Sequence, residues 1–220
     1  FETAFQRACT ALDVEARHFT FAEFQGPAHA SRTLWHRGVQ GVILQTPWPW
    51  QDAVTQFEWD HFSAVKFSRI HPELPLHLVR HSPFDYMHMA LTHTVARGYR
   101  RLAVLLGESD VPLDDDARWG ALLNFQRRHL LKGGELSWRQ IDSKGITPKD
   151  HAWLRRYQAD AIIGFTGFMA SNLYEHGWRF PRDAGFAAVL RAEQPHFQDP
   201  RLPPLSGCAI LIDGIMIRAV

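Results

Sequence analysis

Residues 86–106, YMHMALTHTVARGYRRLAVLL, decide the fold of this chain. In the first half, apolar side chains recur at three- and four-residue spacing, which predicts one buried helix face formed by Met87, Ala90, Leu91, Thr94 and Val95. Gly98 has the backbone freedom that commonly ends a helix, and Arg100 and Arg101 follow it, where cations suit the negative end of the helix dipole. Residues 102–106 are wholly apolar, which predicts a strand covered on both faces. A helix followed by such a strand is half of a parallel α/β unit.

The rest of the chain repeats this alternation of helices and strands. Apolar periodicity and turn residues predict further helices at residues 1–12, 28–37, 54–61, 119–131, 147–156 and 168–176. Strands are predicted at residues 16–21, 39–44, 64–67, 76–79, 136–141, 159–165 and 185–190. Helices that alternate with strands favour parallel sheets with right-handed crossovers, so we predict an α/β fold.

The composition is that of an ordinary globular protein. Hydrophobic residues make up 45% and charged residues 21% of the 220 residues, and the net charge of +1 gives no general basic field for nucleic acid. Cys9 and Cys208 have no metal or redox spacing, which favours a reduced, cytoplasmic setting, although pairing across the fold stays open. No apolar run is long enough to span a membrane. Residues 1–12 look like a helix without a preceding cap, so we expect a piece of a longer protein.

Five segments in order resemble motifs of the lactose/galactose repressor family. Residues 34–44 resemble its "rGvdGlIl" strand, and residues 96–105 its "G-H-R-R-I-A" junction, with Tyr99 where histidine is usual. The remaining matches are residues 159–165 to "pDAii", residues 177–183 to "G-x-x-vP-x-D", and residues 203–204 to "PplT". Together the five segments cover most of the chain.

This resemblance implies a particular domain organisation. The family core is periplasmic-binding-protein-like, with two parallel-sheet α/β subdomains joined by crossover hinges and an effector bound in the cleft. Residues 1–82 with 205–220 would form the N-terminal subdomain, residues 83–204 the C-terminal one, and the hinge would lie near residues 80–83. The DNA-binding head would lie upstream of this chain.

Candidate ligand contacts follow from the same resemblance and from physics. Ligands of parallel sheets bind beyond the carboxyl ends of the strands, and aromatic rings beside polar groups suit a sugar. The predicted ligand-binding residues are Gln45, Trp48, Trp50, His81, Asp85, Arg118, Trp119, Thr166 and Phe168. The alternative for the tryptophans is a place in the core or a dimer interface, and for the arginine a solvated or ion-paired position on a helix.

The resemblance fails at the positions that usually contact the ligand. The arginine that the family places three residues before a glycine is Ala117 here, and Arg118 stands two before Gly120. The family's Asn-Asp after the "Aii" strand becomes Thr166-Gly167, and its final-strand aspartate falls on Leu190. The family's hinge pair Asp-Asn is replaced by residues 81–82, His-Ser. The identity of the effector is therefore open, and a more apolar or anionic molecule remains an alternative to an ordinary hexose.

Enzymatic and metal-binding motifs are absent from the sequence. There is no Gly-x-Ser-x-Gly, His-Glu-x-x-His, phosphate loop or Cys-x-x-Cys, so we predict neither an enzyme nor a cofactor. The 13 histidines are scattered rather than spaced as metal ligands. The acidic residues within 108–116 lack the spacing of a calcium loop, and we interpret them as a solvated loop before a helix N-terminus.

The functional prediction is the effector-binding and dimerisation core of a lactose-repressor-like transcription regulator. Its expected partners are a small molecule, a carbohydrate or derivative, and a second copy in a cytoplasmic homodimer, with DNA bound only through the missing N-terminal domain. An effector that prefers one arrangement of the subdomains would shift their equilibrium. The alternative is an exported, periplasmic sugar-binding protein of a transporter, which the full-length N-terminus would reveal.

Overall fold

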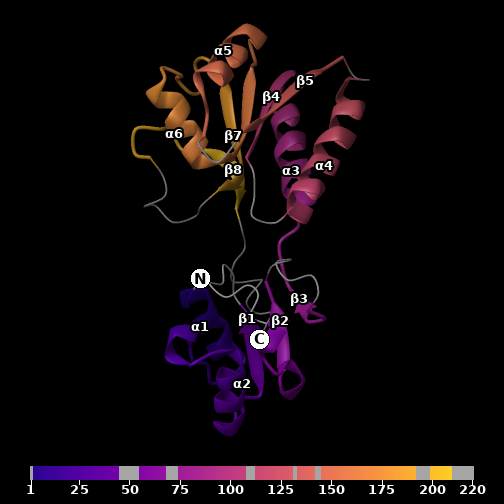
Figure 1. Cartoon of the computed structure of the whole chain (residues 1–220). Coiled ribbons are helices and arrows are strands. Elements are labelled where there is room, and N and C mark those ends of the chain that lie inside the picture. The colour runs from indigo at the N-terminus through magenta and orange to yellow at the C-terminus, as the bar shows by residue number, and fades with distance from the viewer. Residues whose placement is uncertain are drawn as a thin grey trace. The chain divides into compact units, whose positions relative to one another are not determined.

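The computed structural model describes residues 2–44, 55–67, 74–107, 112–130, 133–141, 145–191 and 199–209. The chain divides between His81 and Ser82 into two compact α/β units (Figure 1). Unit 1 is built on Phe1–His81 and unit 2 extends over Ser82–Ile210. Among the described residues, none of the helices combines the length and the apolarity that crossing a bilayer requires.

Unit 1 contains a small parallel sheet with the strand order β1-β2-β3. Its strands are β1 (Gly41–Leu44), β2 (Ser63–Lys66) and β3 (His77–Leu78), and its helices are α1 (Glu2–Ala11) and α2 (Pro27–His36). Two short 3-10 turns, η1 (Phe21–Glu23) and η3 (Trp59–His61), complete the described elements. Ala30 and Leu34 of α2 pack on Phe57 and Phe62, which gives this unit an aromatic core.

Two predictions for unit 1 are wrong. Residues 16–21 do not form a strand, because the backbone N–H and the hydroxyl of Thr20 both donate to Oε1 of Glu23, at 2.7 and 3.1 Å, and close a turn. Of the helix predicted over residues 54–61, only 3-10 turns are present among the described residues. The rings of Phe57 and Trp59 lie 4.4 Å apart, and an α-helix would send side chains two residues apart to different faces.

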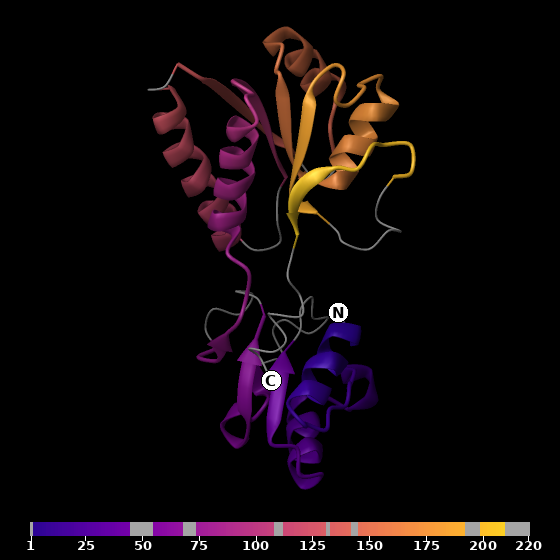
Figure 2. The same cartoon turned by 180° about the vertical axis from the view of Figure 1, so that it is seen from behind.

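Unit 2 is a five-stranded parallel sheet with the order β5-β4-β6-β7-β8, covered by helices on both faces (Figures 1 and 2). Helices α3 and α4 cover one face and α5 and α6 the other. The elements are α3 (Pro83–Ala96), β4 (Arg101–Gly107), α4 (Pro112–Leu130), β5 (Glu135–Ile141), α5 (Pro148–Tyr157), β6 (Ala161–Thr166), α6 (Gly167–Glu175), β7 (Gly185–Arg191) and β8 (Ser206–Ala209).

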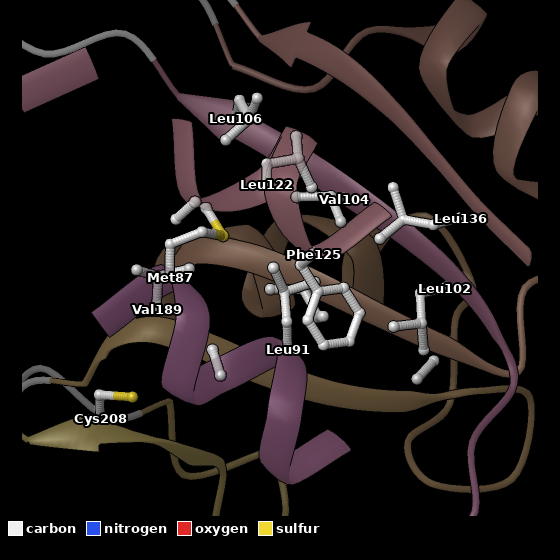
Figure 3. Close-up of a cluster of buried hydrophobic side chains, with 14 residues drawn as sticks. Met87, Leu91, Leu102, Val104, Leu106, Leu122, Phe125, Leu136, Val189 and Cys208 are labelled. Atoms are coloured by element: carbon white, nitrogen blue, oxygen red, sulfur yellow. The ribbon is translucent and has the colours of Figure 1, made fainter. Parts of the chain in front are cut away.

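Strand β4 lies inside this sheet, and both of its faces are buried. Leu102, Val104 and Leu106 point into the layer of α3 and α4, whereas Ala103 and Leu105 point to α5 and α6, and none is more than 3% exposed. Figure 3 shows the first set packed against Met87, Leu91, Leu122 and Phe125. The prediction of a strand covered on both faces is confirmed.

Two boundaries in unit 2 differ from the predicted ones. Helix α4 begins at Pro112 rather than near residue 119, so Asp114 and Asp115 lie in its first turn instead of in a preceding loop. Residues 205–220 were assigned to the N-terminal subdomain, yet β8 pairs with β7 in unit 2. Cys208 of β8 is buried against α3, which gives this short strand a place in the core. Neither Cys208 nor Cys9 forms a disulfide.

Candidate functional site

The strand order places a topological switch point in unit 2. From β4 the chain passes outward to β5 and then returns across β4 to β6, so the connections after β4 and β6 run in opposite directions. Ligands of open parallel sheets bind outside the carboxyl ends of such strands. Here these ends are Gly107 of β4 and Thr166 of β6. We call the group Gly107, Asp115, Arg118, Phe165 and Thr166 the switch-point cluster.

Arg118 is the centre of the switch-point cluster. Its side chain is buried and forms an ion pair with Asp115, one helical turn earlier on α4. Nη2 also donates to the carbonyl oxygen of Gly107 at 3.5 Å, and the guanidinium carbon lies 4.3 Å from the centre of the Phe165 ring. One arginine therefore connects α4 with the ends of both strands at the switch point.

The electrostatics of the cluster combine one cation with nearby carboxylates. Burial lowers the pKa of the Arg118 guanidinium, and the charge of Asp114 opposes that shift. Arginine nevertheless stays protonated at neutral pH, because its ordinary pKa lies far above 7. Asp114 and Asp115 in the first turn of α4 also suit the positive end of the helix dipole. The cluster thus offers a donor, an acceptor and an aromatic ring in one place.

Thr166 and Phe168, both predicted ligand contacts, lie at and just after the carboxyl end of β6, the strand that pairs with β4. Thr166 ends β6 and occupies the N-cap position of α6 with an extended backbone, and its side chain is half-buried. Phe168 follows in the first turn of α6 and is 63% exposed. The structure therefore brings Arg118, Thr166 and Phe168 to the same edge of the sheet.

Asp85 also lies near this edge, because α3 runs antiparallel to the strands and begins at their carboxyl ends. Ser82 caps α3, and its hydroxyl oxygen accepts from the backbone N–H of Asp85 at 3.2 Å. The side chain of Asp85 is exposed. Asp85 stays a predicted contact at the start of unit 2.

The other predicted contacts lie elsewhere or outside the described residues. Trp119, next to Arg118 in sequence, packs edge-on against Trp138 of β5 with ring centres 4.3 Å apart, along the outer edge of the sheet. His81 is half-buried and is the last residue of unit 1. The described residues do not include Gln45, Trp48 and Trp50.

The sequence analysis missed three members of the switch-point cluster, Gly107, Asp115 and Phe165, of which two have side chains that contact Arg118. Phe165 was counted only as part of a predicted strand, although its place at the carboxyl end of that strand was a signal. Asp115 was assigned to a solvated loop, although its spacing of three residues from Arg118 suits an ion pair on a helix. Among the residues that the structure describes, no group of three histidine, cysteine or acidic side chains is placed to hold a metal ion.

Comparisons with known proteins agree with this fold. No family model and no curated protein matches the chain. A periplasmic binding protein/LacI transcriptional regulator from Alkaliphilus metalliredigens, complexed with D-xylulofuranose, is 12% identical with a TM-score of 0.63, over 99% of this chain and 81% of that one. A LacI-family regulatory protein from Chloroflexus aggregans is 18% identical with a TM-score of 0.65, over 99% and 79% of the two chains.

The Lac repressor bound to ONPG gives a similar result. It is 15% identical with a TM-score of 0.64, over 100% of this chain and 68% of that one. These structures are regulators and binding proteins rather than enzymes. At such low identity the likeness concerns the fold. The chain therefore has the periplasmic-binding-protein-like fold of the LacI-type regulators, as its sequence motifs indicated.

Proposed function

We propose that this chain is the effector-binding core of a LacI-type transcription regulator and that its effector is a neutral carbohydrate. The observation that carries the proposal is the switch-point cluster, in which Arg118, Asp115 and Phe165 meet at the carboxyl ends of β4 and β6. The solved structures of this fold include complexes with D-xylulofuranose and with ONPG, which supports a sugar or sugar derivative as the ligand class.

The charges of the cluster favour a neutral effector over an anionic one. Arg118 already has Asp115 as its ion-pair partner, and Asp114 lies close enough to influence its pKa. An anionic ligand would be repelled by both carboxylates. The hydroxyl groups of a polyol, in contrast, can donate to a carboxylate and accept from a guanidinium. Phe168, 63% exposed in the first turn of α6, offers a ring face for the C–H surface of a sugar.

The position of the cluster supports a regulatory role. The chain enters unit 2 at Ser82, before α3, and β8 ends at Ala209, so both connections lie at the carboxyl-end edge that carries the cluster. An effector bound there would lie at the edge from which both connections leave the unit, and its preference for one conformation would shift a two-state equilibrium. In this proposal the regulator is a cytoplasmic homodimer that binds DNA through another domain.

Titration calorimetry with a defined panel tests the ligand class. The neutral probes are D-xylose, D-xylulose, D-glucose, D-galactose and an aryl galactoside, and the anionic probes are galacturonate and glucose 6-phosphate. We expect a neutral sugar to bind and Arg118→Met to weaken its binding at least tenfold, because a charged hydrogen bond contributes about 1.5–3 kcal/mol.

The matched control is Arg182→Met, which removes an exposed arginine paired with Asp183 at 2.9 Å on a distant turn. This control should bind the sugar as the unmodified chain does. Binding restricted to the anionic probes would contradict the neutral effector. Sugar binding that is unchanged in Arg118→Met would contradict the assigned site.

A further inference from the structure

Unit 2 carries an excess of arginine at the edge of its sheet opposite the switch-point cluster. Each of its helices leads from the carboxyl end of one parallel strand to the amino end of the next, so α3 to α6 all end at this amino-end edge (Figure 1). Exposed arginines lie there in the last turns of α4 and α5 and in the turns before β4 and β7. We call the group Arg100, Arg127, Arg128, Arg155, Arg156 and Arg179 the amino-edge surface.

The arginines of the amino-edge surface form no ion pair among the residues that the structure describes. Nη2 of Arg155 donates to the carbonyl oxygen of His176 at 3.2 Å, and Nη1 of Arg179 donates to that of Tyr174 at 3.0 Å. Carbonyl oxygens at the end of a helix carry only a partial negative charge, so these bonds orient the guanidinium groups without neutralising them. The helix dipole favours cations in the last turns, but Arg100 lies outside any helix and adds to the excess.

The acidic groups near the amino-edge surface already have other partners. The carboxylate of Asp160 accepts from the backbone N–H groups of Arg100 and Arg101 at 2.7 and 3.0 Å. Glu135 pairs with the Arg101 side chain at 2.9 Å. Further acids at this edge pair with arginines outside the surface, Asp183 with Arg182, and Glu175 and Asp199 with Arg201. The charges of the amino-edge surface therefore remain available to an external anion.

The make-up of this surface favours a phosphate backbone over a protein as the partner. A guanidinium group matches a phosphate with two parallel N–H donors. A protein interface needs an apolar centre, and among the described exposed large apolar side chains of unit 2, Leu130 alone lies at this edge. Contacts to nucleic-acid phosphates depend on charge rather than on apolar area. A pocket of about 200 Å³ beside Arg100 also gives a projecting phosphate room at the start of β4.

We propose that the amino-edge surface binds the phosphate backbone of duplex DNA, independently of base sequence. The net charge of +1 does not reveal this surface, because aspartates gather at the other edge, at Asp85 and in the first turn of α4. DNA contact was predicted only for a missing domain, and the amino-edge surface adds a second contact that does not read the sequence. In a regulator this contact would hold neighbouring DNA, so that role rests on the proposed function, whereas the binding itself does not.

Fluorescence anisotropy of a labelled DNA duplex of random sequence tests the surface. We expect the chain to bind the duplex, and the logarithm of the binding constant to fall linearly with the logarithm of the salt concentration, because binding releases counterions. Arg127→Gln/Arg128→Gln should weaken binding at least tenfold at low salt, since two phosphate contacts are lost. It should also make the salt slope shallower by about two, since each lost contact removes about one. Arg155→Gln/Arg156→Gln should act alike.

Two further variants separate charge at this edge from other effects. Arg127→Lys/Arg128→Lys keeps both charges and should retain most of the binding. Arg32→Gln/Arg37→Gln is the matched control, because it removes two exposed arginines of unit 1 and changes the net charge equally. This control should bind the duplex as the unmodified chain does. Thermal unfolding of each variant identifies any that fails to fold.

A chain that does not bind the duplex at low salt would overturn the proposal. So would an equal loss in the control and in Arg127→Gln/Arg128→Gln, which would mean that general charge is responsible. Binding confined to vesicles that contain phosphatidylglycerol, or to polyglutamate, would replace DNA by a membrane or an acidic protein. Sugar binding measured on the same variants should be unchanged, so failure of the DNA contact and failure of the effector site give different results.

Discussion

The guanidinium carbon of Arg118 lies 4.3 Å from the centre of the Phe165 ring, although the two residues belong to α4 and β6. A contact of this kind contributes about 0.5–2 kcal/mol, depending on how far water is excluded. Arg118 is 4% exposed, so it is close to the desolvated limit. The same side chain therefore holds two elements of unit 2 together and places a buried cation at the switch point.

Breaking the Arg118–Asp115 ion pair should destabilise the chain. Arg118→Met preserves much of the side-chain volume but leaves Asp115, which is 22% exposed, without its cation, so we expect a loss of about 3 kcal/mol in the free energy of unfolding. In the Arg118→Met background, Asp115→Asn should cost far less than it does alone, because the uncompensated carboxylate is gone. Urea unfolding of the four chains measures this coupling, and additive losses would show that the pair is not coupled.

Much of the secondary structure was predictable because a buried strand or helix face requires apolar side chains at regular positions in the sequence. Residues 102–106 are apolar at every position, and only a strand covered on both faces requires that. Residues 16–21 carry a similar but weaker apolar pattern. There the hydrogen bonds of Thr20 to Glu23 close a turn, and no strand forms. Strand β8, SGCA, has no apolar pattern at all. It forms because β7 offers an edge to pair with, and no local rule predicts that.

The candidate site was predictable only in part, for a related reason. Arg118 and Phe168 were identified because each stands near the N-terminus of a predicted helix that follows a strand. Phe165 was not identified as a partner of Arg118, because their contact depends on β4 and β6 being neighbours. β4 and β6 are neighbours only because β5 pairs with the opposite edge of β4. This strand order is a property of the whole sheet rather than of any one segment.

Gly164→Ala should destabilise unit 2. A Cβ at this position of β6 would lie 2.7 Å from Cζ of Phe186 and 3.2 Å from Cβ of Met169. The Phe186 ring is itself buried, so it has little room to move, and overpacking of this kind costs about 1–3 kcal/mol. Denaturant unfolding measures the loss. The double variant Gly164→Ala/Phe186→Leu should recover part of it, and no recovery would mean that the ring is not the obstacle.

Gly120→Ala is the matched control, and it should raise the stability of unit 2 rather than lower it. Gly120 lies within α4, and a Cβ there would meet no atom within 4 Å. Alanine restricts the unfolded chain more than glycine does and favours the helix by up to about 1 kcal/mol. We therefore expect a higher midpoint of thermal unfolding. A lower one would indicate that the space beside Gly120 is needed by a neighbouring segment.

The stability of unit 2 should decrease as the pH falls below about 6.5, the ordinary pKa of histidine. His151 is buried, and its ring stacks on His176 with centres 4.2 Å apart. Burial, followed by the charge of His176, lowers the pKa of His151, while Asn172 and Asp150 act in the opposite direction and Arg155 adds to the lowering.

Because the unfolded chain takes up this proton at higher pH than the folded chain, the contribution of His151 is complete above the unfolded pKa and is lost as the pH falls toward the folded pKa. Urea unfolding at a series of pH values measures the slope. His151→Phe keeps a stacking ring and should flatten it, whereas His93→Gln, on an exposed position of α3, should not. Equal slopes in all three chains would contradict this assignment.

Asp150→Asn should weaken the start of α5. The Oδ2 atom of Asp150 accepts from the hydroxyl and the backbone N–H of Thr147 at 2.6 and 2.9 Å, and Oδ1 accepts from Nη1 of Arg139 at 2.9 Å. Burial alone would raise the pKa of Asp150, but these donors outweigh burial and lower the pKa. The carboxylate therefore stabilises the fold above its unfolded pKa, and this stabilisation is lost as the pH falls through the folded pKa. We expect a loss of about 1–2 kcal/mol at pH 7, which chemical denaturation measures. Lys149→Ala, one residue away and exposed, should change little, and an equal loss in both would show that the carboxylate of Asp150 is not responsible.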